Sequence, residues 1–175
     1  MKKFIKFSAI TFLIVVLALG VFIYFFGPRP PKEAQLIQNF NEHRAAFTEL
    51  RDMLQADTNL CRIGKWGVEI QNPFFLGYPS EKNFPTNRFK KYLALFKETG
   101  ALAASRGEGT NADPSIVVWG YGFAGDTRHI WICWQDREPT NQIPTLDGYG
   151  GESVYPNTTI AFKHIDQQWY LAADW

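Results

Sequence analysis

The chain reads SIVVWGYGF at Ser115–Phe123 and RHIWICWQD at Arg128–Asp136. Apolar and aromatic residues dominate both stretches, which is typical of strands that are buried on at least one face. The link between them, Ala124–Thr127, is short and contains glycine and aspartate, as expected for the turn of a β-hairpin. These are the strongest strand signals of the chain, and we predict a sheet built around their hairpin.

Further strands are expected on both sides of this hairpin. Leu60–Ile70 reads as one strand, because apolar residues alternate with lysine, glycine and glutamate in its second half, and a bend near Gly64 would bring both halves onto one face. Ala101–Gly107 is a short strand, and Thr159–Ile165 pairs with Trp169–Asp174 in a closing hairpin. Consecutive strands joined by tight turns indicate an antiparallel sheet.

Two amphipathic helices are predicted. Lys32–Ala56 repeats apolar residues at helical spacing, with His43 at the missing step of the stripe. The apolar positions are Leu36, Phe40, Phe47, Leu50 and Leu54. His43 is interpreted as a residue at the edge of the core, with a tunable buried histidine as the alternative. Thr86–Thr99 begins at a Thr86 or Asn87 cap, ends at Gly100, and has a stripe of Phe89, Leu93 and Phe96.

This order of elements predicts an α+β fold with a two-layer domain. Two helices with one apolar stripe each would pack on a curled antiparallel sheet of about five to six strands. We expect this domain over residues 32–175, after a stiff proline-rich tether at residues 27–31. The sequence contains no internal repeat and no low-complexity stretch.

The N-terminal segment Phe7–Phe26, FSAITFLIVVLALGVFIYFF, contains no charged residue. As a helix it would be about 30 Å long, which matches the hydrocarbon thickness of a bilayer. Lys2, Lys3 and Lys6 precede it, so the positive-inside rule predicts a cytoplasmic N terminus and an extracytoplasmic C-terminal domain. We therefore predict a single-pass anchor at residues 1–26, in the inner (cytoplasmic) membrane.

A cleavable signal peptide is the alternative for this segment. Ala18–Gly20 offers small residues for a cleavage site, but the apolar run continues through Val21–Phe26, where a polar mature start is expected. A lipoprotein signal is disfavoured because Val21 stands where the lipidated cysteine would be.

Composition excludes several function classes. From Lys32 onward there are 14 basic and 17 acidic residues, a net charge of −3, which disfavours nucleic-acid binding. Cys61 and Cys133 are candidates for one disulfide outside the cytoplasm, or for two buried thiols. Two such cysteines do not match the usual zinc arrangements, and no GxSxG, HExxH or GxGxxG motif occurs, so no metal or cofactor is expected.

Aromatic residues are the notable chemistry of the chain, with 6 Trp, 7 Tyr and 15 Phe. Helices are available for only one face of the predicted sheet, so rings on the other face would mark a binding surface. The alternative is a curled sheet with both faces covered. The contacts predicted for a partner are Trp119, Tyr121, Arg128, Trp131 and Tyr149.

Arg137–Thr158 is a long segment without periodicity, and segments of this kind often cap a domain or contact a partner. A catalytic pair of His129 and Cys133 is disfavoured, because four residues along a strand separate them by about 13 Å. The carboxylates that remain candidates for acid/base chemistry are Asp136, Glu138, Asp147 and Glu152.

These observations favour a non-enzymatic, membrane-anchored binding module. Its layout of lysine-flanked anchor, proline tether and small aromatic-rich domain resembles that of many small bacterial envelope proteins. The partner would be a protein met near the membrane surface, for example a toxin that an immunity or inhibitor-type protein neutralises. The alternatives are a small-ligand-binding or hydrolytic pocket of the kind NTF2-like folds have, lined by His43, Asp136 or His164, and a scaffold subunit of an envelope complex.

Overall fold

The computed structural model describes residues 12, 15–17, 29–70, 77–79, 83–106, 113–123, 126–148 and 160–174. The chain divides into two units, Met1–Pro30 and Pro31–Trp175. Within the predicted anchor only Phe12 and residues 15–17 are described; these are helical with exposed side chains, and the rest of Phe7–Phe26 lies outside the described residues. No helix in the described ranges is long and apolar enough to cross a membrane.

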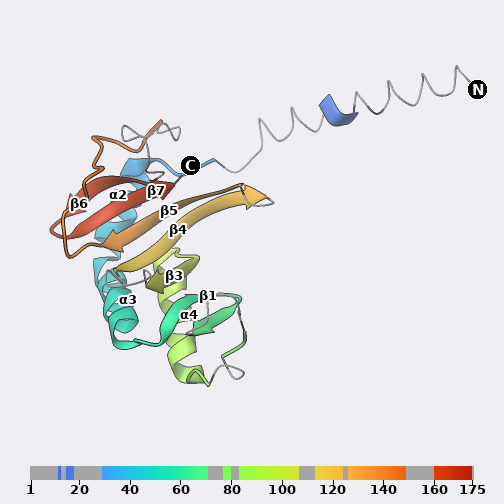
Figure 1. Cartoon of the computed structure of the whole chain (residues 1–175), viewed down its shortest axis with the longest axis vertical. Helices are drawn as coiled ribbons and strands as arrows, with labels where there is room; N and C mark the ends of the chain where they lie inside the picture. Colours follow the sequence, from blue (N-terminus) through green and yellow to red (C-terminus); the bar gives the residue numbers. More distant parts are fainter. Residues whose placement is uncertain are drawn as a thin grey trace, which may run out of the picture. The chain divides into compact units, whose positions relative to one another are not determined.

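The second unit is an α+β domain built on one seven-stranded sheet (Figure 1). The strands are β1 (Leu60–Gly64), β2 (Gly67–Ile70), β3 (Ala103–Arg106), β4 (Pro114–Phe123), β5 (Asp126–Trp134), β6 (Ile160–Asp166) and β7 (Trp169–Asp174). Their spatial order is β2-β1-β3-β4-β5-β7-β6, and every neighbouring pair is antiparallel. The antiparallel sheet is confirmed, with one strand more than the upper prediction.

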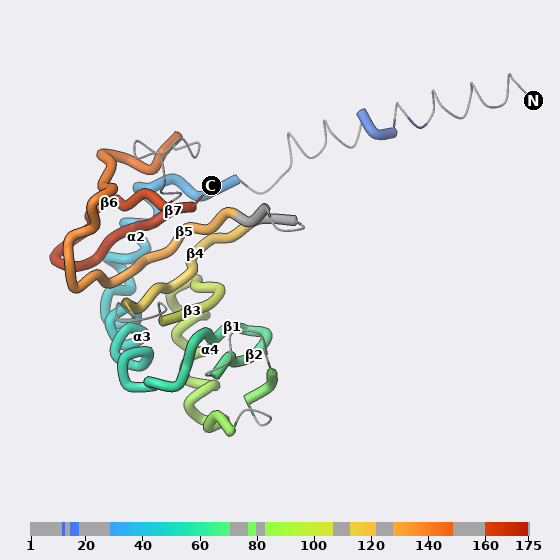
Figure 2. The backbone as a smooth tube through the Cα atoms, in the orientation of Figure 1, coloured from blue at the N-terminus to red at the C-terminus, as the bar shows by residue number. Residues whose placement is uncertain are grey.

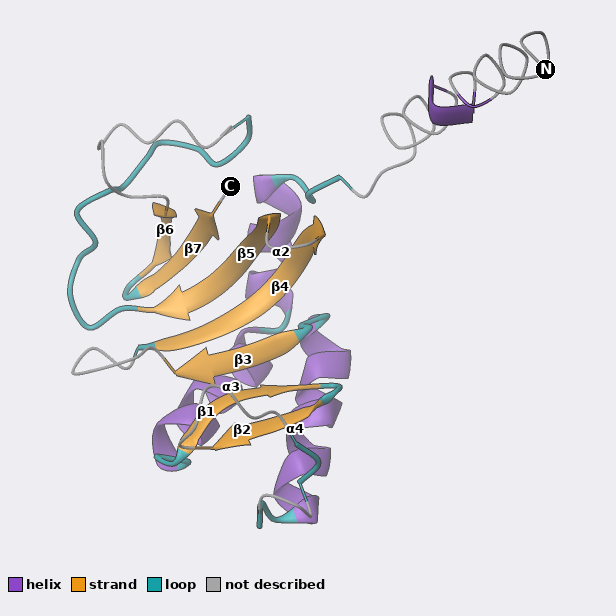
Figure 3. Cartoon of the chain, turned by 45° about the vertical axis from the view of Figure 1, so that its right-hand side comes forward, coloured by secondary structure: helices purple, strands orange, loops and turns teal. Residues whose placement is uncertain are grey.

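Three helices lie on one side of this sheet, behind the strands in Figure 3. They are α2 (Glu33–Glu42), α3 (Arg44–Ala56) and α4 (Thr86–Thr99). The core lies between the two layers and is formed by fully buried side chains. Its largest members include Phe40, Phe47, Leu50, Tyr92, Phe96, Ile116, Ile132 and Leu171. Each such side chain contributes about 1.5–3 kcal/mol by burial, so this layer carries most of the stability.

The predicted single helix Lys32–Ala56 was wrong, because the chain breaks at His43 into α2 and α3. His43 has φ −114° and ψ 26°, outside the helical range, and its side chain is half-buried at the corner. The break brings Phe40 and Phe47 together with ring centroids 5.5 Å apart. In a continuous helix Phe40 and Phe47 would be separated by a rise of about 10 Å. The break at His43 brings the two rings closer, so both pack together on the sheet.

The single strand predicted for Leu60–Ile70 was also wrong, because this segment is a hairpin of β1 and β2 turned at residues 65–66. Both arms send alternate residues to the helices, Ile63 from one and Val68 from the other, so the alternation survives the turn. Gly64 permits the turn to close, since a Cβ there would lie 2.6 Å from the Trp66 ring.

The prediction for α4 is confirmed in its bounds and in its end at Gly100, which has the left-handed φ of 72°. Its first cap is Pro85, not Thr86 or Asn87. The buried face is rotated from the predicted stripe, because Phe89 and Leu93 are only half-buried. The residues fully turned inward are Tyr92, Leu95, Phe96 and Thr99.

A loop segment bridges each outer edge of the sheet at one position. Along β6, the Phe162 amide donates to the carbonyl of Asn141, and the Ile143 amide donates to the carbonyl of Phe162. Figure 2 shows this part of the loop following the outside of β6. Along β2, Val68 and Gly77 exchange backbone hydrogen bonds of 3.0 and 3.1 Å. Each bridge blocks the addition of a further strand at that position.

Candidate functional site

The face of the sheet opposite the helices, here called the outer face, carries no helix in the described part of the chain (Figure 3). Directly opposed residues of antiparallel strands lie on the same face. One line of such residues crosses all seven strands and contains no charged or polar side chain. This apolar row consists of Gly67, Gly64, Ala103, Val117, Trp131, Ala172 and Phe162.

Large rings project from the half of the row on β5, β7 and β6. Trp131 and Phe162 are half-buried, on either side of the small residue Ala172. Together with Ile160 they pack against the buried side chains of Cys133, Tyr170 and Ala172. The outer face therefore has a small aromatic cluster of its own, which leaves part of Trp131 and Phe162 accessible.

A second line on this face is mixed. It runs through the cluster members Cys133 and Tyr170 and the polar residues Glu69, Arg62, Ser105, Ser115 and His164. Glu69 is only 1% exposed and pairs with Arg62 at 3.0 Å, while its Oε1 atom has no hydrogen-bond partner. Sequence reasoning placed Glu69 among the solvent-facing residues of a strand, because a lone glutamate in an alternating pattern gives no sign of burial.

His129 and Asp174 form a polar corner beside Trp131. Asp174 lies opposite His129 across β5 and β7, accepts its backbone N–H, and has Oδ2 at 3.4 Å from the ring Nδ1. The His129 ring contacts Trp131 edge-on, with centroids 6.0 Å apart. Gly120 makes room for this ring, since a Cβ there would lie 3.0 Å from His129 Cδ2. A partner on Trp131 would thus also meet an imidazole.

The structure separates the five residues that the sequence placed in one binding set. A register shift between Val117 and Trp119 turns Trp119 to the helix side, opposite Ile130, where it packs against the main core. Tyr121 lies opposite Arg128 near the end of the same hairpin and is 44% exposed. Tyr149 lies outside the described residues, and of the four described members of the set Trp131 alone lies on the outer face.

Cys61 and Cys133 are not joined and stand as free thiols. They belong to β1 and β5, which are separated by β3 and β4. Three strand spacings amount to about 14 Å, beyond the reach of a disulfide. Burial raises the pKa of the Cys133 thiol to about 12.

The residues considered for a pocket or for catalysis are dispersed. His43 lies between α2 and α3, Asp136 is exposed beyond β5, and His164 is exposed on β6, where its Nε2 lies 2.8 Å from the Gln167 carbonyl. Asp136 instead approaches Asp113, whose pKa is raised by burial and by the neighbouring carboxylate. The sequence did not single out Asp113, since only hairpin pairing brings the ends of β4 and β5 together.

No group of three or more His, Cys, Asp and Glu residues within the described ranges is arranged to hold a metal ion. Glu138 and Asp147 lie in the loop after β5; Glu152 lies outside the described residues. The first part of the predicted partner-contact segment Arg137–Thr158 is fastened to the domain, because it pairs with β6 and buries Leu146.

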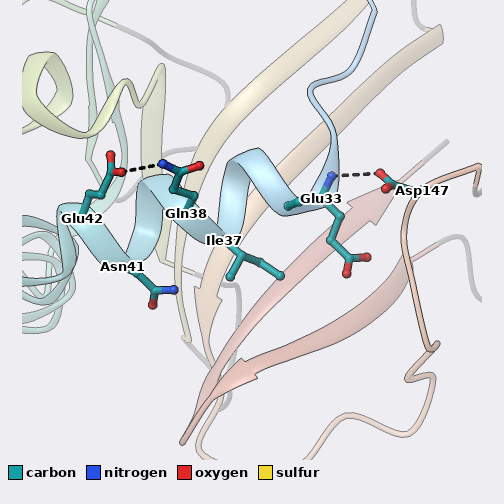
Figure 4. Close-up of a pocket in the computed structure, with 7 residues that line it drawn as sticks. Glu33, Ile37, Gln38, Asn41, Glu42 and Asp147 are labelled. Atoms are coloured by element: carbon teal, nitrogen blue, oxygen red, sulfur yellow. Dashed lines mark hydrogen bonds between the residues drawn. The ribbon is translucent and has the colours of Figure 1, made fainter.

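A groove on the helix side is the second surface feature. It has a volume of about 650 Å³ and lies along α2, whose lining side chains leave the helix on both sides (Figure 4). It is lined by Glu33, Ala34, Ile37, Gln38, Asn41, Glu42 and Asp147. The Glu33 amide donates to Asp147 Oδ1 at 2.9 Å, which closes one end, and Gln38 donates to Glu42 Oε1 at 2.7 Å near the other.

Comparison with protein-family models, curated proteins and solved structures finds no match for this chain.

Proposed function

We propose that this protein is a membrane-anchored binding module whose outer face recognises a protein partner close to the membrane surface. The observation that carries the proposal is the apolar row, which presents Trp131 and Phe162 on a face without a helix in the described ranges. Trp131 and Phe162 stay partly accessible, whereas Ala103 and Ala172 of the same row are buried, and aromatic side chains of this kind supply much of the binding energy of protein interfaces.

The bridged edges of the sheet favour recognition by a face. Strand addition requires an unpaired edge, and both β2 and β6 already hydrogen-bond to loop segments. The described interior between helices and sheet is occupied by core side chains such as Phe47 and Ile132, which favours a surface site over an internal pocket.

The anchor is proposed from charge and hydropathy. Lys2, Lys3 and Lys6 precede Phe7–Phe26, and the described part of that segment exposes helical apolar side chains. The tether of residues 27–31 spans about 15 Å when extended, so the partner would be met near the bilayer. Carbonate extraction should leave the full chain in the membrane fraction, and release of the chain by carbonate would contradict the anchor. Protease added to the extracytoplasmic side of the membrane should digest a C-terminal tag, and protease on the cytoplasmic side should not.

The binding proposal is tested by affinity capture with the tagged full chain, solubilised from its native envelope in mild detergent. We expect one stoichiometric protein partner with the wild type and with Lys97→Glu, a charge change on the exposed surface of α4. Trp131→Glu should lose that partner while its melting temperature shows that the domain is folded. Equal capture by a folded Trp131→Glu variant, or a co-purified metabolite without a partner protein, would contradict the proposal.

A further inference from the structure

We infer that the groove along α2 is a second binding site, which takes an extended, positively charged peptide segment of a partner protein. Its lining surface is mainly apolar, and carboxylates stand at both ends (Figure 4). Glu33 and Asp147 mark one end and Glu42 the other, with no Lys, Arg or His among the lining residues. Charge complementarity therefore selects a cationic occupant.

The carboxylates are held in place without being neutralised. Glu33 Oε2 accepts the Thr145 hydroxyl at 2.9 Å and the Leu146 amide at 2.6 Å. Glu42 and Asp147 each have one oxygen in a hydrogen bond, from Gln38 and from the Glu33 amide. Among the described residues no salt bridge reaches any of these three carboxylates. Pre-positioned acceptors reduce the ordering cost of binding.

The spacing of the charges sets the form of the ligand. Glu33 and Glu42 are the first and last residues of α2, so they lie about 14 Å apart along the helix axis and about two and a half turns apart around it, and their side chains leave the helix on opposite sides (Figure 4). An extended peptide that crosses the helix obliquely covers the axial part of this distance in about four residues. Between the carboxylates lie the exposed Ala34 and the half-buried Ile37. This lining suits a peptide in which two basic residues are separated by apolar residues.

The groove is separate from the outer face, because α2 lies on the helix side of the sheet (Figure 3). The groove begins at Glu33, two residues after Pro31, which is the first residue of the domain unit. The two surfaces can therefore be occupied independently, and a change in one should leave binding at the other intact.

The test uses the full chain in maltoside micelles and the capped peptide GKALAKG with an uncharged dye, followed by fluorescence anisotropy. The peptide GEALAEG, titrated in parallel, is the charge control. We expect saturable binding of the lysine peptide that weakens as salt rises. Glu42→Gln and Asp147→Asn should each weaken it about fivefold, the effect of losing one exposed charge pair.

Ala34→Arg should abolish binding, because it fills the groove and adds a positive charge on an exposed helix position. Glu98→Gln on the exposed face of α4 and Trp131→Glu on the outer face should bind the peptide like the wild type. Circular dichroism confirms the fold of each variant. The inference is overturned if the wild type shows no saturable binding, if GEALAEG binds equally, or if folded Ala34→Arg keeps its affinity.

Discussion

Trp119 and Trp131 belong to paired strands of one hairpin, yet they face opposite sides of the sheet. Val117 lies opposite Trp131, and the register then shifts, so that Trp119 lies opposite Ile130. One additional residue on β4 reverses every later side chain on that strand. Trp119 consequently packs on the main core, whereas Trp131 packs on the outer-face cluster.

The two tryptophans should therefore differ in what their removal costs. Trp119→Ala should lower the free energy of unfolding by about 2–3 kcal/mol, somewhat less than for a fully buried ring, and should leave partner capture intact. Trp131→Ala should cost about 1 kcal/mol and lose most partner binding. Urea midpoints and capture yields measure the two effects. A stable Trp119→Ala variant that fails to capture the partner would reverse this assignment.

The cysteines should differ in reactivity. Cys133 is buried and its pKa is raised to about 12, whereas Cys61 is partly exposed. Because the thiolate is the reactive form, N-ethylmaleimide should modify Cys61 in the native protein and Cys133 only after unfolding. Mass spectrometry of digested protein locates the label. A peptide in which Cys61 and Cys133 are disulfide-linked in the non-reduced digest would contradict the fold.

In the Arg62–Glu69 pair the glutamate is buried and the arginine is half exposed, so the stability of the fold should depend on the pairing. Arg62→Ala leaves the Glu69 carboxylate, 1% exposed, without its 3.0 Å ion pair, and should lower the unfolding free energy by about 3 kcal/mol. Arg62→Ala combined with Glu69→Gln should recover much of this loss, since no buried charge remains. Urea denaturation of the double-mutant cycle measures the coupling. Equal losses for the single and double variants would show that the pair is not what limits stability.

Stability should fall at alkaline pH because burial raises the pKa of Tyr92, Cys133 and Tyr170, with the larger shifts at Tyr92 and Cys133. Burial and a 2.8 Å hydrogen bond to Asp57 raise the pKa of Tyr92, and burial raises that of Cys133 from 9.0 to about 12. The folded state keeps both protons where the unfolded chain loses them. Stability is therefore complete below about pH 9 and declines above it, by about 1.4 kcal/mol per pH unit for each group.

Variants assign that decline to its sources. Cys133→Ala should remove the loss of stability that begins near pH 9.0. Tyr92→Phe should remove the loss that begins near pH 10.0. Tyr92→Phe should also cost about 1 kcal/mol at neutral pH for the lost hydrogen bond. Urea denaturation at successive pH values measures both slopes. An unchanged alkaline slope in the double variant would mean that other groups control it.

The sequence was sufficient to predict those elements in which the residues of the turn and the periodicity of the apolar residues agree. The β4–β5 and β6–β7 hairpins follow from apolar runs joined by polar links, and α4 from its stripe and its terminal Gly100. The turn at residues 65–66 escaped prediction because Lys65 and Trp66 lack the residues that favour a tight hairpin turn. The break at His43 escaped it because both halves keep helical spacing.

The candidate site was less predictable than the fold. The apolar row depends on the strand order β5-β7-β6, which brings Phe162 beside Ala172 and Trp131 although 31 positions separate Trp131 from Phe162. The bulge after Val117 decides which tryptophan faces outward, and it leaves no sign in the sequence. Tyr121 and Arg128 were correctly placed on one hairpin, but away from Trp131's face.

Site-specific photo-crosslinking in the native membrane tests the proposed binding face most directly. A benzophenone amino acid is placed in the full chain at Val117 or Phe162 on the outer face, or at the exposed Ala94 of α4 as the control. We predict that Val117 and Phe162 give adducts with the same partner protein and that Ala94 gives none. Adducts from Ala94 with no adduct from either outer-face position would contradict recognition through the outer face.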